Sequence, residues 1–279
     1  MKVRIEQESN YKAFFFPQTG RTVRIALDSS KPIEKVKFPE FYDVKITDYC
    51  TGECPYCYMD STDKKPHFDN ICEKIEQYFG AMEPNQRPFQ VAIGGGEPTT
   101  HPEFLDLLAT FQSLGIQPNY TTNGRLVCKD IINATIEYCG GVAVSCHPHL
   151  NAEWRMAVQS FASRGMKLNL HLIISDKDSI EYFLECYKIF KDVVDHFVLL
   201  PYGSQGRAKE KRIDWEYLLG RAPMDCSKLA FGANFHQYLV KGEHPFKVSL
   251  YEPEAFSGFL DLSDMKLYES SFDLRERQC

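Results

Sequence analysis

From about residue 43 onward, short apolar strand candidates alternate with segments that carry apolar residues at helical spacing. After the first unit the strand candidates recur every 25 to 28 residues, which is the length of a strand plus a helix that crosses back over the sheet. The candidates are DVKIT, FQVAIGGG, GIQPNYTT, GVAVSC, LNLHLIIS and HFVLLP. This rhythm predicts an α/β fold, and six units favour a partial TIM-like (β/α)6 barrel over a doubly wound sheet.

Helices are expected between these strands wherever apolar residues recur every three or four positions. The clearest such segments are residues 71–82, 104–111, 154–162 and 180–187. Thr100 and Glu103 have the spacing of a capping box at the start of the second helix, and Gly115 and Gly165 stand where C-terminal caps belong.

The repeat is flanked by two extensions. Residues 1–40 contain the strand candidates KAFFF and TVRIAL, joined by the turn-forming PQTGR, and predict an N-terminal β-hairpin. The barrel is expected to span residues 41–205. Residues 206–279 begin with a charged helical segment and end with two strand-like runs, FKVSLYEP and GFLDLSDMKLY. We interpret them as a small α+β C-terminal extension that covers the open side of the barrel.

Composition excludes several classes of protein. The chain has 279 residues, 43% of them hydrophobic, and can bury a substantial core. It shows neither the opening of a secretion signal nor an apolar run of the roughly 20 residues that span a bilayer, so we expect a cytoplasmic protein. Ten scattered cysteines do not fit a disulfide framework. The net charge of −6 argues against a nucleic-acid partner.

Three cysteines, Cys50, Cys54 and Cys57, lie close together in CTGECPYC, directly after the first barrel strand. Ligands bind at the carboxyl ends of the strands in both α/β arrangements, so this loop lies on the expected functional rim. A structural zinc site needs four ligands, and His67 is the available fourth. The other interpretation is a four-iron cluster held by three thiolates, with one iron left open for chemistry.

The cysteine spacing resembles the CxxxCxxC signature of the radical S-adenosylmethionine (radical SAM) superfamily. The resemblance implies a partial barrel and a [4Fe-4S] cluster whose open iron binds S-adenosylmethionine. It also implies that the reduced cluster cleaves this cofactor and so generates a 5′-deoxyadenosyl radical, which abstracts a hydrogen atom from substrate. Tyr56 matches the aromatic position of the signature, which packs near the adenine.

A second motif follows the next strand, in VAIGGGEPTTHP. Gly95, Gly96, Glu97 and Pro98 resemble the GGE(P) motif of the same superfamily, which contacts the cofactor. Glycine lets a backbone approach a ligand closely, and a carboxylate can accept hydrogen bonds from an ammonium group.

Later strand ends match more loosely. The resemblance implies that Asn123 and Ser145 contact the cofactor, although each is equally typical of a turn or a helix cap. Ile173 and Leu200 would flank the adenine, or would belong to the plain core.

The sequence identifies the residues of the substrate site less specifically. The candidates for hydrogen-atom or proton transfer are Cys146, His147 and His171, with Tyr202 and Arg207 at the mouth of the barrel. Residues that alternate with Ser145 are expected to point away from the lumen, which counts against Cys146. Arg207 is expected either to fix an anionic group or to pair with a surface carboxylate.

The C-terminal region resembles a degenerate SPASM or twitch domain, in which further cysteines hold auxiliary clusters. Only Cys226 and Cys279 remain as ligands, and Ser270 and Ser271 stand where such a terminal hairpin often has a cysteine. Two cysteines do not hold a four-iron cluster in the usual way, so we expect a shell without metal.

Taken with the resemblance, these features predict an enzyme that acts on a peptide or protein and receives electrons from a donor such as flavodoxin or ferredoxin. A radical SAM enzyme acting on a small molecule or nucleotide is the alternative. A non-catalytic zinc-binding interaction module is the alternative of another class.

Overall fold

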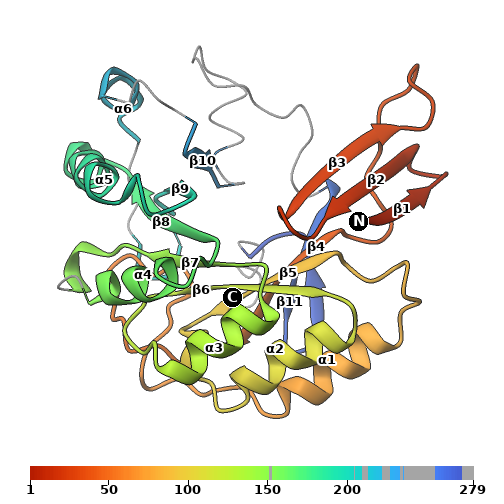
Figure 1. Ribbon diagram of the computed structural model, residues 1–279, viewed down its shortest axis with the longest axis horizontal. Helices are drawn as coiled ribbons and strands as arrows, with labels where there is room; N and C mark the ends of the chain where they lie inside the picture. The colour runs from red at the N-terminus through yellow and green to blue at the C-terminus, as the bar shows by residue number, and fades with distance from the viewer. Residues whose placement is uncertain are drawn as a thin grey trace.

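The computed structural model describes residues 1–150, 153–203, 205–208, 213–221, 227–232, 235 and 255–271. Its centre is a curved sheet whose strands lie in the order β10-β9-β8-β7-β6-β5-β4-β11-β12 (Figure 1). The six barrel strands pair in parallel: β4 (Phe41–Thr47), β5 (Gln90–Gly95), β6 (Gln117–Thr122), β7 (Gly141–Ser145), β8 (Leu168–Ile174) and β9 (His196–Pro201). A doubly wound sheet would reverse its strand order part-way. The partial barrel is therefore confirmed, and the doubly wound alternative is wrong.

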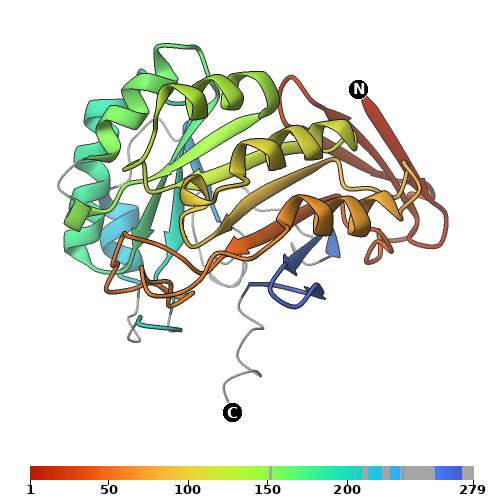
Figure 2. The ribbon, with the colours of Figure 1, turned by 90° about the horizontal axis from the view of Figure 1, so that it is seen from below.

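Helices cover the outer face of this sheet (Figures 1 and 2). They are α1 (Ile71–Gly80), α2 (Phe104–Ser113), α3 (Lys129–Tyr138), α4 (Trp154–Ala162) and α5 (Lys177–Phe190). Shorter helices are η1 (Pro98–Thr100), η2 (Pro148–Leu150) and α6 (Trp215–Arg221). Four of the five long helices were expected. The apolar spacing missed α3 because a core position on it is held by Thr135, whose hydroxyl bonds to the Tyr120 hydroxyl (2.7 Å) and to Ile131 O (2.6 Å).

The two faces of the sheet differ in side-chain size. Large side chains such as Val91, Ile93 and Val144 alternate along the strands and are buried against the helices. The residues between them face the concave side, which we call the lumen. They are small or polar on the central strands: Ala92, Gly94, Thr121, Ala143 and Ser145. The central strands therefore present small or polar side chains to the lumen and large apolar ones to the helices.

The helix caps agree only in part with those predicted from the sequence. Gly115 and Gly165 adopt φ of +73° and +67° after α2 and α4, as expected for C-terminal caps. The expected capping box is wrong. The carboxylate of Glu103 accepts hydrogen bonds from the amides of Ile71 (3.4 Å) and Cys72 (3.2 Å), and so caps α1 instead of its own helix.

The N-terminal hairpin is larger than expected, because β1 (Lys2–Glu6) joins β2 (Tyr11–Phe16) and β3 (Arg21–Ala26) in an antiparallel sheet. One face packs on the barrel through a small core that includes Tyr11, Phe15, Phe89 and Phe256. Gln117 and Gln90 donate to carbonyls of the β2–β3 turn at 3.3 and 3.4 Å. This sheet closes the amino-terminal end of the barrel, and the cysteine loop lies at the other end (Figure 2).

The described C-terminal residues extend the sheet at both edges. β10 (Leu229–Phe231) pairs with β9, and β11 (Ser257–Asp261) pairs in parallel with β4 and forms a hairpin with β12 (Lys266–Tyr268). The run GFLDLSDMKLY therefore forms a hairpin at the β4 edge of the sheet; FKVSLYEP lies outside the described residues. In the part of the chain that the structure describes, no helix is long and apolar enough to cross a membrane.

Candidate active site

The three clustered cysteines lie on the loop after β4, and all three are half-buried. Gly52 lies between them, with its amide 3.3 Å from Cys50 Sγ. A Cβ on Gly52 would stand 3.3 Å from Cys50 Sγ and 3.6 Å from Cys54 Sγ. The missing side chain therefore leaves space beside the two sulfurs, as a bound cluster requires.

The donor set fits a cluster better than a zinc ion. His67 bonds to Thr47 Oγ1 (2.9 Å) and packs between the rings of Tyr49 and His101. Among the described residues, no three His, Cys, Asp or Glu side chains converge on the position of one metal ion, so the predicted set of three cysteines and His67 is not assembled. A four-iron cluster instead occupies the space between its thiolates. Burial and the neighbouring thiols raise the pKa of Cys54 to about 12, so a cationic metal would be needed to hold this thiol as a thiolate at neutral pH.

Arg207 holds the cysteine loop in place. Its guanidinium donates to the carbonyls of Cys54 (3.1 Å) and Ser61 (2.9 Å) and pairs with Asp60 at 2.9 Å. Its backbone amide donates to Cys57 O at 3.0 Å. Of the two roles expected for Arg207, the structure shows the carboxylate pairing, extended by contacts with the loop backbone.

Gly206 makes this contact possible. It has φ of +58°, and a Cβ there would lie 2.5 Å from both Cys57 O and Tyr58 O. Sequence reasoning missed Gly206, because about 150 residues separate it from the loop that it touches.

The GGE motif lies where β5 ends beside the cysteine loop. Glu97 is 2% exposed. Its carboxylate accepts hydrogen bonds from the Thr99 amide and hydroxyl (3.2 and 2.6 Å), the Thr122 hydroxyl (2.7 Å) and the Asn123 amide (2.7 Å). Burial raises the pKa of Glu97, and these hydrogen bonds oppose the shift. Among the described residues, only the Asn123 amide donates to Oε2, which keeps capacity to accept a further hydrogen bond.

The glycines of this motif also let the chain approach the cysteine loop closely. A Cβ on Gly95 would overlap Thr47 O, and one on Gly96 would overlap Tyr49 O. The atoms that require glycine are thus the backbone of the cysteine loop. The amides of Gly96 and Glu97 bond to Thr47 O and Tyr49 O, both at 2.8 Å. Pro98 follows as the first residue of η1.

Asn123, at the end of β6, lies next to the cysteine loop. Its Nδ2 is 4.0 Å from Cys50 Sγ, and its Oδ1 accepts from the Arg125 amide at 3.0 Å. Arg125 in turn donates to Thr51 O at 2.6 Å. The structure therefore brings Asn123 to the expected site, with its side chain also shaping a turn.

Tyr56 joins the cysteine loop to the ends of β7 and β9. Its hydroxyl is 3.0 Å from His147 Nδ1 and 3.3 Å from His149 Nδ1, and its ring meets that of Tyr202 edge-on at 5.9 Å. His149 Nε2 is 3.1 Å from Gly52 O. Burial, with the nearby His149 and His171, lowers the pKa of His147 to about 3. His147 and Tyr202 thus contact the loop that carries the cysteines.

The remaining lumen candidates lie on β7 to β9. Ser145 and His171 are neighbours across β7 and β8, and Ile173 pairs with Leu200 across β8 and β9. Burial lowers the pKa of His171 to about 4. A Cβ on Gly232 would lie 2.5 Å from Leu200 Cδ2, so Leu200 packs against the strand beyond it.

Cys146 does not face the lumen. It is 2% exposed and belongs to the core between the sheet and the helices. Its thiol lies beside Cys186, and burial raises its pKa well above the ordinary value. As a hydrogen-atom donor Cys146 is wrong, because the side chain after Ser145 points to the opposite face of the strand.

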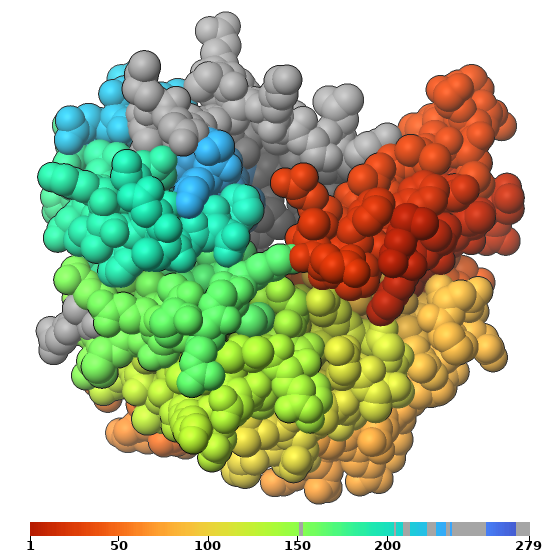
Figure 3. Space-filling model, viewed as in Figure 1, coloured from red at the N-terminus to blue at the C-terminus, as the bar shows by residue number. Residues whose placement is uncertain are grey.

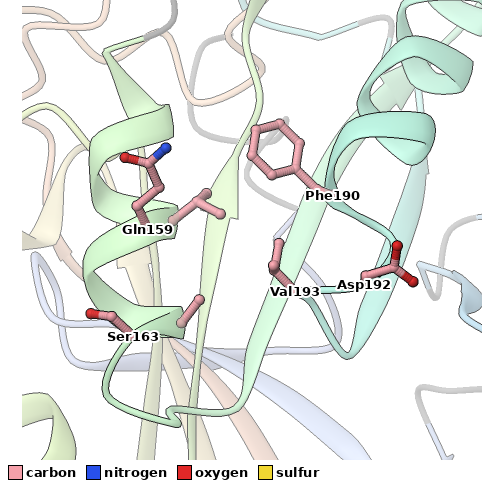
Figure 4. A pocket seen from close by; sticks show the side chains of 7 residues that line it. Gln159, Ser163, Phe190, Asp192 and Val193 are labelled. Carbon is pink, nitrogen blue, oxygen red and sulfur yellow. The ribbon is translucent and has the colours of Figure 1, made fainter.

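A separate surface groove of about 430 Å³ lies between α4 and the end of α5 (Figure 4). Gln159, Ser163, Phe190, Asp192 and Val193 are among the residues that line it. None of the predicted site residues borders this groove; those that the structure brings together lie near the carboxyl ends of the strands.

Comparison with known families agrees with this geometry. The family model of the Radical SAM superfamily matches residues 44–213. The chain belongs to the radical SAM superfamily. Radical SAM enzymes use a [4Fe-4S] cluster and S-adenosylmethionine, so the expected class of enzyme and its cofactors are confirmed at the level of the family. A search of curated proteins found no match.

Solved radical SAM structures share this fold. Streptococcus suis SuiB bound to S-adenosylmethionine is 19% identical with a TM-score of 0.68, and the match covers 87% of this chain and 62% of SuiB. SuiB bound to the precursor peptide SuiA is 18% identical with a TM-score of 0.67, and the match covers 88% of this chain and 62% of SuiB. Native anSMEcpe with bound AdoMet is 15% identical with a TM-score of 0.57, and the match covers 83% of this chain and 75% of anSMEcpe. The chain thus spans about 62% of the length of SuiB, and at these identities the likeness concerns the fold.

Proposed function

We propose that Cys50, Cys54 and Cys57 hold the [4Fe-4S] cluster, and that S-adenosylmethionine binds between this loop and the ends of β5 to β7. The observation that carries the proposal is the joining of the cysteine loop to Glu97 and Asn123 through backbone bonds and one buried carboxylate. When bound, the reduced cluster and S-adenosylmethionine supply a hydrogen-abstracting radical.

The chain's own residues position the cofactor in this proposal. Oε2 of Glu97 accepts a hydrogen bond from the cofactor's ammonium group, and Asn123 and Ser145 offer polar contacts beside it. Gly95, Gly96 and Pro98 fix the Glu97 backbone. Tyr56 supports the loop, and Ile173 and Leu200 supply apolar surface at the other wall. His171 faces the lumen and is the candidate for proton transfer to substrate.

The proposed substrate is a peptide or protein side chain, which must enter the lumen. The lumen-facing side chains of β5 and β7 are small, and this supports a polypeptide segment as the proposed occupant. SuiB has been solved with its precursor peptide SuiA, and anSMEcpe with the Cp18Cys peptide at a TM-score of 0.53. We propose a flavodoxin or ferredoxin as the electron donor.

Anaerobic reconstitution tests the cofactor assignment. The wild type is expected to bind about four irons per chain, with broad visible absorbance, and to form 5′-deoxyadenosine under a strong reductant. The triple variant with Cys50→Ala, Cys54→Ala and Cys57→Ala is expected to lose both, because no thiolate remains. Cys128→Ala, an exposed cysteine outside the loop, is the control and keeps both.

Continued 5′-deoxyadenosine formation by the triple variant would overturn the assignment. A count near eight irons per chain would instead indicate a second cluster. That outcome would contradict the expected metal-free C-terminal shell; Cys226 and Cys279, its remaining cysteines, lie outside the described residues.

A further inference from the structure

The outer face of the N-terminal sheet is apolar. The strand register places Val3, Phe14 and Val23 in one row across β1, β2 and β3, and Ile5 and Ile25 in the next row on either side of Lys12. Directly paired residues of an antiparallel sheet point to the same face. The opposite face carries Tyr11, Ala13 and Phe15 and is the one packed on the barrel.

The apolar side chains of this outer face are open to solvent. Val3, Ile5, Val23 and Ile25 are 44%, 52%, 50% and 45% exposed. An antiparallel sheet with one buried face normally carries polar side chains on the other. A contiguous exposed apolar patch of this kind marks an interaction surface.

Charge on the same face restricts the partner. Lys12 and Arg21 share the outer face, Lys12 Nζ lies 4.9 Å from the centre of the Phe14 ring, and no carboxylate of the described residues pairs with either. The register places no Asp or Glu of β1, β2 or β3 on this face, so its charged residues are Lys12 and Arg21, in a chain whose net charge is −6. A second copy of this basic patch would be repelled, whereas an acidic partner would be attracted.

The position of the face restricts the partner further. The sheet projects from the amino-terminal end of the barrel (Figures 1 and 3), and the cysteine loop lies at the opposite end. An electron donor must approach the cluster, so it does not fit here. In the described part of the sheet, the outer edges of β1 and β3 have no partner strand, so backbone groups are available to an extended segment.

We propose that the outer face of the β1–β3 sheet binds an extended, acidic polypeptide segment that carries apolar side chains. The apolar rows take its apolar side chains, and Lys12 and Arg21 pair with its carboxylates. This binding site is separate from the radical chemistry, so it can be tested without turnover.

The test uses the reconstituted full chain and a fluorescein-labelled peptide of alternating glutamate and leucine, followed by fluorescence anisotropy at low salt. The double variant Val23→Thr with Ile25→Thr keeps strand-forming residues but removes the apolar surface. It is expected to bind about tenfold more weakly. Lys12→Glu with Arg21→Glu is expected to weaken binding similarly and to remove its salt dependence. The same peptide with lysine in place of glutamate is expected not to bind.

Met156→Thr with Ile189→Thr, two exposed residues on the barrel helices, is the matched control and is expected to bind as the wild type does. Iron content and 5′-deoxyadenosine formation in every variant show separately whether the proposed cofactor chemistry holds. Absent or equal binding of the acidic and basic peptides would overturn the proposal. A wild-type dimer that the Val23→Thr, Ile25→Thr variant dissolves would also overturn it, since a second copy would then be the occupant.

Discussion

At the level of single residues, the carboxylate of Glu97 connects two strand ends and the proposed cofactor site. Glu97→Gln replaces one acceptor oxygen with an NH2 group that faces a donor. We expect this change to lower the free energy of unfolding by about 1–3 kcal/mol, because a buried donor loses its partner. It should also weaken S-adenosylmethionine binding, measured by calorimetry on the iron-loaded protein, while the iron content stays the same.

Thr122→Val separates these two effects. It removes one hydrogen bond to Glu97 but leaves the carboxylate charge in place, so stability should fall while cofactor affinity changes little. If Glu97→Gln binds the cofactor as tightly as the wild type, the role proposed for Glu97 is wrong.

His171 predicts a pH dependence of stability. Its pKa in the folded chain is about 4, below the value of about 6.5 expected when unfolded, so protonation favours the unfolded chain. The stability is fully present above pH 6.5 and is lost as the pH falls toward 4. Between pH 7 and pH 5 the loss should be about 2 kcal/mol. Urea unfolding of wild type and His171→Gln measures it, and equal losses in both proteins would contradict the prediction.

At the level of elements, the loop after β9 supports the loop after β4. Gly206→Ala adds a Cβ 2.5 Å from Cys57 O and Tyr58 O, at a φ of +58°. Because the added carbon meets backbone, the cysteine loop must shift, and we expect the iron content after reconstitution to fall by more than half. Iron and sulfide analysis measures this.

Gly80→Ala is the control for that change, since Gly80 lies in α1 with nothing within 4 Å of an added Cβ. It should keep full iron content and gain slight stability, because alanine is the better helix former. Equal iron content in the two variants would show that the loop tolerates movement.

At the level of the whole molecule, the C-terminal hairpin is tied to the barrel by a buried charge. Lys45 Nζ lies 2.8 Å from Asp48 and 3.2 Å from Asp261 of β11, and Asp261 is fully buried. Asp261→Asn removes one partner of a buried ammonium group, which should cost about 3 kcal/mol in denaturant unfolding. Glu269→Gln, which breaks the exposed pair with Lys35, should leave the free energy of unfolding unchanged within error. Similar losses in both variants would contradict this account.

Much of the barrel was predictable, because each strand carries an apolar run and each buried helix except α3 carries an apolar stripe. β1 was not, because its inward residue is Arg4, whose guanidinium is buried and donates to the carbonyls of Asn85 and Pro39. A charged residue satisfied by backbone leaves no apolar signal in the sequence.

The residues of the candidate site also fall into those that local motifs predict and those that they do not. The cysteines and Glu97 belong to local motifs and could be located from sequence. The contacts that hold them, from Arg207, Gly206 and the Tyr56–His147 pair, join segments far apart in the chain. Such contacts depend on how the barrel curves, which no local pattern encodes.

The hydrogen bonds from Arg207 to the cysteine loop have a consequence for the time during synthesis at which that loop becomes ordered. A ribosome releases the cysteine loop early, but the side chain that fastens it comes about 150 residues later, after the last barrel strand. A chain that has not yet reached residue 207 therefore has the three thiols but lacks the hydrogen bonds from Arg207 that hold their loop. On the proposed assignment of Cys50, Cys54 and Cys57 as iron ligands, we therefore expect metal loading after synthesis has passed residue 207.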